Sequence, residues 1–219
     1  MYHYINDKKF LKEMRRECSD VINRLVQNIN NSDRLKVKMQ LVGSGGRNLV
    51  TQDGDEPVDL DYNLHIEKII DKNYNEKMIK EYIRDEFNKV LELKNWGTCS
   101  DSKSVLTTKK KRISKNNKTL VSIDLAITCT LNNKVQRLIH EKTGDTNTDR
   151  WYWNEVPNSN KINKKAKCIK KRGHWLDLRA KYLEKKNKYL KEQDYNHPSI
   201  VCYIEAINEI YDKLPKSGD

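Results

Sequence analysis

The sequence of 219 residues lacks the features of several large classes of protein. Its five histidines have no zinc-binding spacing, and its five cysteines are odd in number with no Cys-x-x-Cys pair. The N-terminus has no apolar signal core, and no segment reaches membrane-spanning length. We therefore expect a cytoplasmic protein with reduced thiols, and we expect neither secretion nor a membrane partner.

The chain as a whole is rich in charged residues and poor in apolar ones. Only 36% of the residues are hydrophobic and 34% are charged, with a formal net charge of +12 at pH 7. Such a balance favours polyanionic partners such as RNA, DNA or nucleotides. A chain rich in lysine and asparagine can also reflect compositional bias alone, and composition does not separate these two interpretations. The length allows one sizeable domain or a compact pair of lobes.

A glycine-rich segment, Gly43-Ser44-Gly45-Gly46, follows a stretch that alternates apolar and polar residues from 34 to 41. The alternation predicts a strand that runs directly into a tight turn. Successive backbone amides in such a turn can bind a phosphate group. No Gly-Lys-Ser/Thr follows, and Asn48 stands where a G-x-G-x-x-G fingerprint needs glycine. The segment therefore argues against P-loop, kinase and Rossmann proteins.

Two carboxylates follow this turn in the segment from 58 to 64. In an extended strand, Asp59, Asp61 and Asn63 lie on one face, while the apolar residues between them pack on the other. Magnesium prefers oxygen ligands, and one or two carboxylates plus substrate phosphates commonly complete its site. An Asp-x-Asp pair also occurs on ordinary solvated strand faces, so the pair gains its weight from the glycine turn before it.

A third carboxylate, Asp124, lies in a strand-like segment from 119 to 128. The apolar residues Val121, Ile123, Leu125 and Ile127 make one face of this segment, and Asp124 lies on the other. A carboxylate in the middle of a half-buried strand is costly unless something pairs with it. A metal site at this face would explain why a carboxylate lies there. The alternative is that Asp124 faces solvent or pairs with a nearby lysine.

Taken in chain order, Gly43-Ser44, Asp59-x-Asp61 and Asp124 resemble the signature of the polymerase-β-like nucleotidyltransferase superfamily. The extended form of the signature has a threonine after the Gly-Ser turn, and Thr51 matches it. This form is similar to archaeal CCA-adding enzymes and to oligonucleotide second-messenger synthases. The resemblance covers about residues 8 to 130.

The resemblance implies an α+β fold with a mixed sheet flanked by helices, and a two-metal reaction on a nucleoside triphosphate. Asp59 and Asp61 would bind one Mg²⁺ or Mn²⁺ ion with the triphosphate. All three aspartates would bridge a second ion that activates the acceptor hydroxyl. Gly43, Ser44 and Gly45 would hold phosphate oxygens, and catalysis would consist of positioning and electrostatics.

Helical periodicity predicts a long helix from 10 to 29, a second from 78 to 91, and a helical C-terminal third. Strands are expected around 103–113, 119–131 and 134–141, with a hairpin turn at 115–118. A loop is expected from 142 to 158, where the composition shifts. We therefore expect a catalytic domain at 1–141 and a helical lobe at 142–219 that closes the nucleotide cleft. Three helices are expected there, the first of them ended by Gly173.

Basic residues concentrate in the first of those C-terminal helices, just after Trp151-Tyr152-Trp153. Lys164 and Lys165 are our candidates for contact with a nucleotide, because positive charge near the cleft would neutralise a triphosphate or a nucleic-acid backbone. The aromatic rings could stack on bases. Solvated helix faces and packing anchors are the ordinary alternatives for these residues.

Three hypotheses on function follow, and oligomeric state stays open. The first is an enzyme that transfers a nucleoside monophosphate to a macromolecule, with RNA slightly favoured by the basic charge. The second is an enzyme that uses a small acceptor, either an antibiotic or a second nucleotide. The third is a nucleic-acid-binding or regulatory module without turnover, and the presence of all three acids argues against it.

Overall fold

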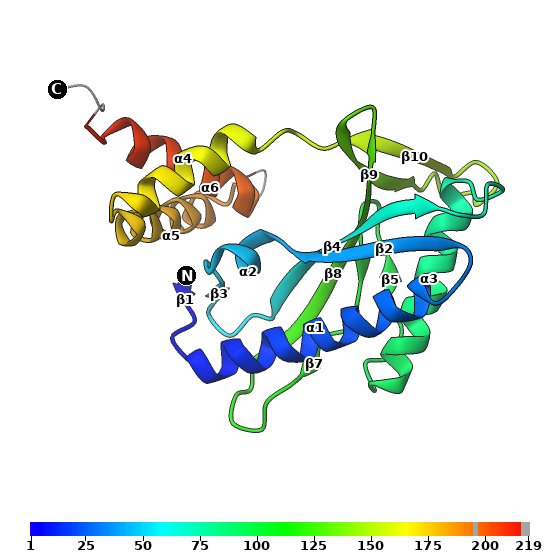
Figure 1. Cartoon of the computed structure of the whole chain (residues 1–219). Helices are drawn as coiled ribbons and strands as arrows, with labels where there is room; N and C mark the ends of the chain where they lie inside the picture. Colours follow the sequence, from blue (N-terminus) through cyan, green and yellow to red (C-terminus); the bar gives the residue numbers. More distant parts are fainter. Residues whose placement is uncertain (195–196, 216–219) are drawn as a thin grey trace. The chain divides into compact units, whose positions relative to one another are not determined.

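In the computed structural model, which describes residues 1–194 and 197–215, the chain forms two compact units (Figure 1). The sheet unit comprises Asn6–Asn48 and Glu56–Val156. The helical unit comprises Met1–Ile5, Leu49–Asp55 and Pro157–Asp219. Three segments of the chain therefore contribute to the helical unit, two of them short and the third being the C-terminal part.

The sheet unit is built on a mixed sheet with the strand order β10-β9-β8-β4-β2. Strands β4 and β8 are parallel neighbours, and every other pairing in this sheet is antiparallel. The strands are β2 (Leu35–Leu41), β4 (Val58–Ile69), β8 (Leu120–Leu131), β9 (Lys134–Glu141) and β10 (Arg150–Glu155). The predicted α+β class with a mixed sheet is confirmed.

Burial along β4 alternates residue by residue, as its sequence predicts. Leu60, Tyr62 and Leu64 have no exposed surface, whereas Asp59, Asp61 and Asn63 between them are exposed or half-buried. Helix α1 (Lys8–Asn30) packs against β2 and against α3 (Glu76–Leu93), and Ser19 of α1 bonds to Tyr62. Burying each large apolar side chain contributes about 1.5–3 kcal/mol. The apolar face therefore forms the core and leaves the acidic face for chemistry.

The segment before β8 forms three very short strands in place of one long one. These are β5 (Ser100–Asp101), β6 (Leu106–Thr107) and β7 (Lys111–Arg112). Strands β6 and β7 pair with the first half of β8, and β9 pairs with its second half. The predicted strand at 103–113 is therefore broken, and Thr107 lies directly opposite Asp124 in the ladder.

The predicted loop at 142–158 is wrong in part, because it contains β10. Trp151 of this strand stacks on His140 of β9, with ring centroids 4.3 Å apart, and Lys77 lies 5.0 Å above the same indole ring. His140 in turn bonds through Nδ1 to Asp101 (2.7 Å) and through Nε2 to Asp149 (3.0 Å). Trp151 is thus a packing anchor of the sheet unit, which is the ordinary alternative for an aromatic residue.

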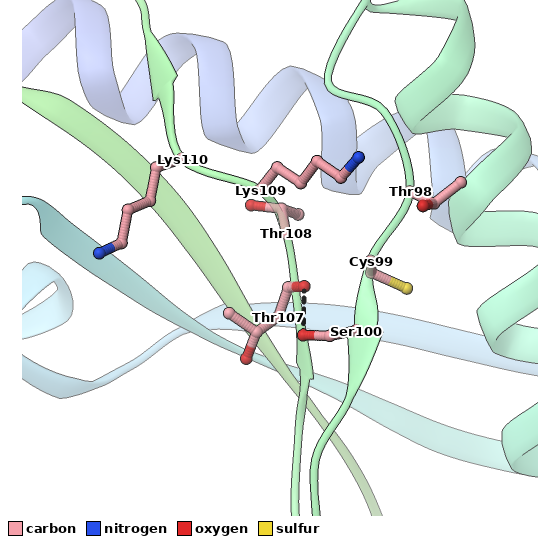
Figure 2. Close-up of a pocket in the computed structure, with 7 residues that line it drawn as sticks. All are labelled: Thr98, Cys99, Ser100, Thr107, Thr108, Lys109 and Lys110. Carbon is pink, nitrogen blue, oxygen red and sulfur yellow. Dashed lines mark hydrogen bonds between the residues drawn. The ribbon is translucent and has the colours of Figure 1, made fainter.

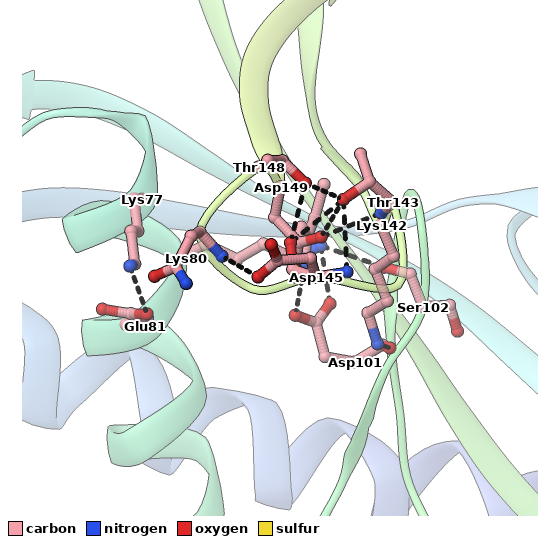
Figure 3. Close-up of polar contacts among 12 residues, drawn as sticks. Lys77, Lys80, Glu81, Asp101, Ser102, Lys142, Thr143, Asp145, Thr148 and Asp149 are labelled. Carbon is pink, nitrogen blue, oxygen red and sulfur yellow. Dashed lines mark hydrogen bonds and ion pairs between the residues drawn. The ribbon is translucent and has the colours of Figure 1, made fainter.

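The same polar network ties helix α3 to the end of the sheet (Figure 3). Lys80 pairs with Asp101 at 2.6 Å and donates to the carbonyl of Ser102 at 2.9 Å, and both charged side chains are almost fully buried. Burial lowers the pKa of Lys80, while its pairing with Asp101 opposes that shift. Removing one partner of such a pair leaves an uncompensated buried charge, so the network fixes the hairpin before β8 in place.

The helical unit contains α4 (Asn160–Lys171), α5 (Trp175–Lys191) and α6 (Ser199–Asp212), at the positions expected from the sequence. Gly173, with φ +85°, lies between α4 and α5. A two-stranded sheet of β1 (Tyr2–Tyr4) and β3 (Thr51–Asp53) completes the unit. Over the described residues, no helix has the length and apolar character needed to cross a bilayer.

The short helix α2 (Gly43–Arg47) replaces the simple glycine turn expected from the sequence. Arg15 of α1 holds its C-terminal end by donating to the carbonyl of Gly45 (3.1 Å) and to the side chain of Asn48 (2.8 Å). Asn48 ends the helix in the left-handed conformation, with φ 58°. The segment therefore has a fixed geometry between β2 and β3.

Candidate functional site

The three predicted carboxylates lie on one face of two adjacent parallel strands. Asp61 of β4 is the direct partner of Asp124 of β8, and Asp59 is the partner of Ser122. Neighbouring strands are about 4.8 Å apart. The register therefore brings together three acids that are separated by up to 65 positions in the chain.

Two of the three carboxylates accept a hydrogen bond from a neighbouring hydroxyl. Thr107 of β6 donates to Oδ1 of Asp124 at 2.6 Å, and Ser122 of β8 donates to Oδ1 of Asp59 in a very short bond. Asp61, which lies between them, accepts no side-chain hydrogen bond from any residue in 1–194 or 197–215. The hydroxyls fix two carboxylates and leave the third without a donor.

The electrostatic environment disfavours charge on these acids. Burial raises the pKa of Asp61, and the adjacent carboxylates of Asp124 and Asp59 raise it further, against opposition from Arg137 and Arg47. Burial also raises the pKa of Asp124, with Asp59 adding to the shift and Thr107 opposing it. Like charges held this close favour the proton on one of them unless a cation is present.

The donor set fits a hard divalent cation. It offers only oxygen atoms, as Mg²⁺ and Mn²⁺ prefer. The buried Oδ1 of Asn63, the next residue along the same face of β4, also has no hydrogen-bond partner in the described part of the chain. Among the described residues, however, no group of three or more acidic, histidine or cysteine side chains is arranged so that it could hold a metal ion by itself. Oxygen atoms from a substrate would have to complete the ligand set.

Gly43 stands directly against one of the carboxylates. Its φ is +59°, and a Cβ atom at this position would lie 2.8 Å from Cγ and 3.1 Å from Cβ of Asp61, and closer still to its Oδ2. Real Cβ atoms do not approach other atoms so closely. Moreover, the Val42 amide donates to the Asp61 carbonyl at 2.9 Å. The glycine segment and the acidic strand therefore form one site.

The other predicted residues fall in two places. Ser44 and Gly45 lie in the first turn of α2, where backbone amides have no intrahelical partner. Thr51, Lys164 and Lys165 belong to the helical unit. Lys164 is exposed on α4, whereas Lys165 donates to Asn208 of α6 at 2.7 Å. This bond gives Lys165 a packing role whether or not it also binds a nucleotide.

Three basic residues in distinctive surroundings had no signal in the sequence. Arg47 and Arg137 lower the pKa of Asp61, so both lie within electrostatic reach of it. Lys186 of α5 donates to Thr51 at 2.9 Å and lies 3.6 Å above the ring of Tyr2. Burial lowers the pKa of Lys186 to about 8. Only the strand register and the helix packing reveal these residues, because each is one lysine or arginine among 43.

Comparison with solved structures finds the same fold in known proteins. The chain is similar to CdnC from E. coli MS115-1 with ATP, with a TM-score of 0.60 and 13% identity over 95% of this chain and 62% of that one. It is also similar to Vibrio cholerae DncV in its 3'-deoxy ATP bound form, with a TM-score of 0.57 and 14% identity over 98% of this chain and 55% of that one. The chain thus spans less than two thirds of the length of both.

Another DncV structure is described as a cyclic AMP-GMP synthase and a prokaryotic cGAS homolog. Its TM-score is 0.54 at 13% identity, over 97% of this chain and 68% of that one. The chain shares the mixed α+β fold of the nucleotidyltransferases CdnC and DncV. The fold predicted from the glycine turn and the three acids is thereby confirmed. No protein-family model matches the sequence, and no curated protein is significantly similar to it.

The crowded acids should make the metal-free protein less stable at neutral pH. Below the ordinary pKa of 3.8, Asp61 is protonated in both the folded and the unfolded states, so its ionisation does not change the free energy of unfolding. As the pH rises, the unfolded chain loses its proton first, so the free energy of unfolding falls until folded Asp61 also ionises. Asp61→Asn should therefore raise the melting temperature at pH 7 in EDTA.

Melting curves of the wild type and Asp61→Asn between pH 4 and pH 8 test this prediction. The advantage of the variant should shrink as the pH falls toward the ordinary carboxylate pKa, since the low-pH difference measures the substitution without its charge. Mg²⁺ should raise the melting temperature of the wild type more than that of the variant. An advantage that is constant with pH would contradict the electrostatic explanation.

Proposed function

We propose that the protein is a metal-dependent nucleotidyltransferase that moves a nucleoside monophosphate from a nucleoside triphosphate to the hydroxyl of a second nucleotide. The observation that carries the proposal is the set of three carboxylates on adjacent parallel strands, with Gly43 against Asp61. The fold shared with the cyclic AMP-GMP synthase DncV supports the nucleotide acceptor. One solved DncV structure contains the linear intermediate 5' pppA(3',5')pG.

In this proposal Asp59, Asp61 and Asp124 would hold Mg²⁺ or Mn²⁺, which supplies charge neutralisation for the triphosphate and for the transition state. The amides of Ser44 and Gly45 bind phosphate oxygens at the start of α2. Asp59 is oriented by Ser122, and Asp124 is oriented by Thr107 through Oδ1. The other oxygen of Asp124 is then left to face the substrate.

The reaction forms one bond and breaks another. The acceptor oxygen attacks the α-phosphorus of the triphosphate, the bond between that phosphorus and the bridging oxygen breaks, and pyrophosphate leaves. The hydroxyl proton passes to Oδ2 of Asp124, the carboxylate oxygen that does not accept the hydrogen bond from Thr107. Arg47 and Arg137 stabilise negative charge that develops beside Asp61.

Labelled substrates test this function. The full chain is incubated with α-³²P-labelled ATP, GTP, CTP or UTP, singly and in pairs, with Mg²⁺ or Mn²⁺. The expected result is pyrophosphate together with a short or cyclic oligonucleotide, identified by mass spectrometry. Absence of pyrophosphate release under every condition would refute the proposal.

Two further acceptors are tested in the same assay, because the basic charge of the chain also fits RNA and the fold also suits other small molecules. RNA and aminoglycoside antibiotics are added in separate reactions. Label found only in RNA or only in the antibiotic would reassign the acceptor while keeping the nucleotidyltransferase chemistry. Binding of a nucleoside triphosphate without any turnover would favour a regulatory module instead.

A further inference from the structure

Helix α4 of the helical unit (Figure 1) is basic along its whole length. Its twelve residues include six lysines and no acid. Three of the lysines, Lys164, Lys167 and Lys171, are exposed, and their spacing of three and four residues places them within an arc of about 60° on one side of the helix. We call these three residues the lysine row. The chemistry proposed above does not use them.

The lysine row has no part in holding α4 in place. The opposite side of the helix does that, because Ile169 has no exposed surface and Ile162 and Ala166 pack against the same apolar core. Lys165, beside the row, donates to Asn208 of α6 at 2.7 Å. In the part of the chain that the structure describes, no ion pair, hydrogen bond or ring contact involves any lysine of the row. The three charges are therefore available to a partner.

The neighbouring helix α5 differs, because glutamates accompany its lysines. Lys181 pairs with Glu184 at 2.7 Å, and Lys185 pairs with Glu209 of α6. Helix α4 offers no such partner, since its sequence contains no aspartate or glutamate. The positive charge of the lysine row is therefore not balanced by any acid on its own helix.

The lysine row weakens the helix that carries it. Lys164 and Lys167 are three residues apart, Lys167 and Lys171 are four apart, and like charges at these spacings destabilise a helix. The first turn of α4 has no acid to favour its start, and the side chain of Ser159 does not cap it. Binding of an anionic partner would relieve the repulsion, which packing within the unit does not.

The spacing of the row fits a nucleic-acid strand. Lys164 and Lys171 are seven residues apart, so the row is about 10.5 Å long. A nucleic acid carries about one phosphate per 3.4 Å of axis on each strand, so about three phosphates lie along this length. A helix that binds a membrane surface would instead need apolar side chains on its free side, and the apolar residues of α4 are packed inside the unit.

The other basic run of the chain, Lys109 to Arg112, lacks such a row. In Figure 2 the side chains of Lys109 and Lys110 extend to opposite sides of their segment. Lys111 and Arg112 donate to backbone carbonyls. A run of consecutive basic residues is therefore not enough, and the helical spacing of α4 is what aligns the charges.

We propose that the lysine row of α4 binds the phosphate backbone of a nucleic acid, through about three phosphates and without reading its sequence. Sequence is read by contacts to base edges, and the row offers only ammonium groups. The site goes beyond the proposed function, because transfer to a second nucleotide requires no polymer. Binding is tested without turnover, and its failure would leave the proposed function untouched.

Fluorescence anisotropy of the full chain in EDTA, with labelled oligonucleotides of about 20 residues, tests the site. Single-stranded RNA, single-stranded DNA and the same DNA as a duplex are measured separately between about 50 and 200 mM salt. In Lys164→Gln/Lys167→Gln/Lys171→Gln, the slope of log affinity against log salt should be flatter by about 2 on single strands, at about 0.7 per lost contact. The wild type should therefore lose about 20-fold more affinity than this variant over the same range.

Two controls match this variant. Lys8→Gln/Lys9→Gln/Lys12→Gln removes three exposed lysines from the start of α1 in the sheet unit and should keep the wild-type slope. Lys→Arg at all three positions of the row keeps the charges and should also keep the slope. Since the row repels itself, the glutamine variant should not have a lower melting temperature than the wild type at low salt. Weaker binding by that variant is then not a loss of folding.

Identical slopes in the wild type and the row variant, or equal flattening by the control on α1, would overturn the proposal, as would no binding of any oligonucleotide at the lowest salt. Vesicles that contain anionic lipid and polyglutamate are titrated in parallel. If only one of these probes depended on the row, the surface would belong to a membrane or to an acidic protein, and the proposal would fail. Binding of RNA alone or DNA alone that depends on the row supports the proposal and identifies the partner.

Discussion

Asp61→Asn is expected to reduce pyrophosphate release to below about one-thousandth of the wild-type rate, since loss of metal-assisted charge neutralisation costs several kcal/mol of transition-state stabilisation. Asp59→Asn and Asp124→Asn should each do the same. The three carboxylates lie side by side on β4 and β8 and act as one ligand set, so removing any one should cost nearly as much as removing all. Initial rates in saturating nucleotide and Mg²⁺ or Mn²⁺ measure the effect.

The control is Asp85→Asn, which removes the same charge from an exposed position on α3. It should retain wild-type activity. Circular dichroism should show that all four variants are folded, because asparagine keeps the shape of aspartate and relieves repulsion at Asp61. Full activity in any two of the three site variants would refute the shared metal site.

The position of the acidic residues on one strand face was predictable, because it follows from local periodicity. A two-residue alternation places Asp59 and Asp61 on one face of any strand, and the observed burial of β4 follows that alternation. Burial along β8 does not alternate in this way, because Ser122 and Ala126 on the face of Asp124 are buried as well. What periodicity could not supply is the parallel register that makes Asp61 and Asp124 direct partners, since register depends on contacts between distant segments.

The supporting residues were not predictable for the same reason. Thr107 and Ser122 orient two of the carboxylates, yet hydroxyl residues are common and neither stands at a distinctive spacing. Thr107 reaches Asp124 only because the predicted strand at 103–113 breaks and its first fragment pairs with β8. Arg137 reaches Asp61 electrostatically from β9, two strands away.

The error at β10 has a physical cause. Residues 142–158 contain several threonines, asparagines and aspartates, which favour turns, and these outweighed the short aromatic run at 151–153. In the structure a strand forms there because Trp151 stacks on His140, which two carboxylates hold in place. The strand is stabilised by tertiary contacts that no local pattern contains.

Gly43→Ala is expected to abolish nucleotidyl transfer and to destabilise the protein. The Cβ atom would occupy the space of the Asp61 carboxylate, so either the carboxylate or α2 must move. A displacement of this kind at a reacting centre can cost about 100-fold in rate. Left-handed backbone adds about 1–2 kcal/mol of strain in any residue with a Cβ. Turnover, nucleotide affinity and urea unfolding are measured together.

Gly144→Ala separates the two effects. Gly144 also has positive φ, at +92°, but nothing lies within 4 Å of its missing Cβ. This variant should show the backbone strain alone, with a modest loss of stability and wild-type turnover. Gly43→Val should be at least as damaging as Gly43→Ala, because its branched side chain also blocks the approach of phosphate to the backbone. If Gly43→Ala instead matched Gly144→Ala in both stability and turnover, the glycine would not be needed for the position of Asp61, and the site would have to be rebuilt without α2.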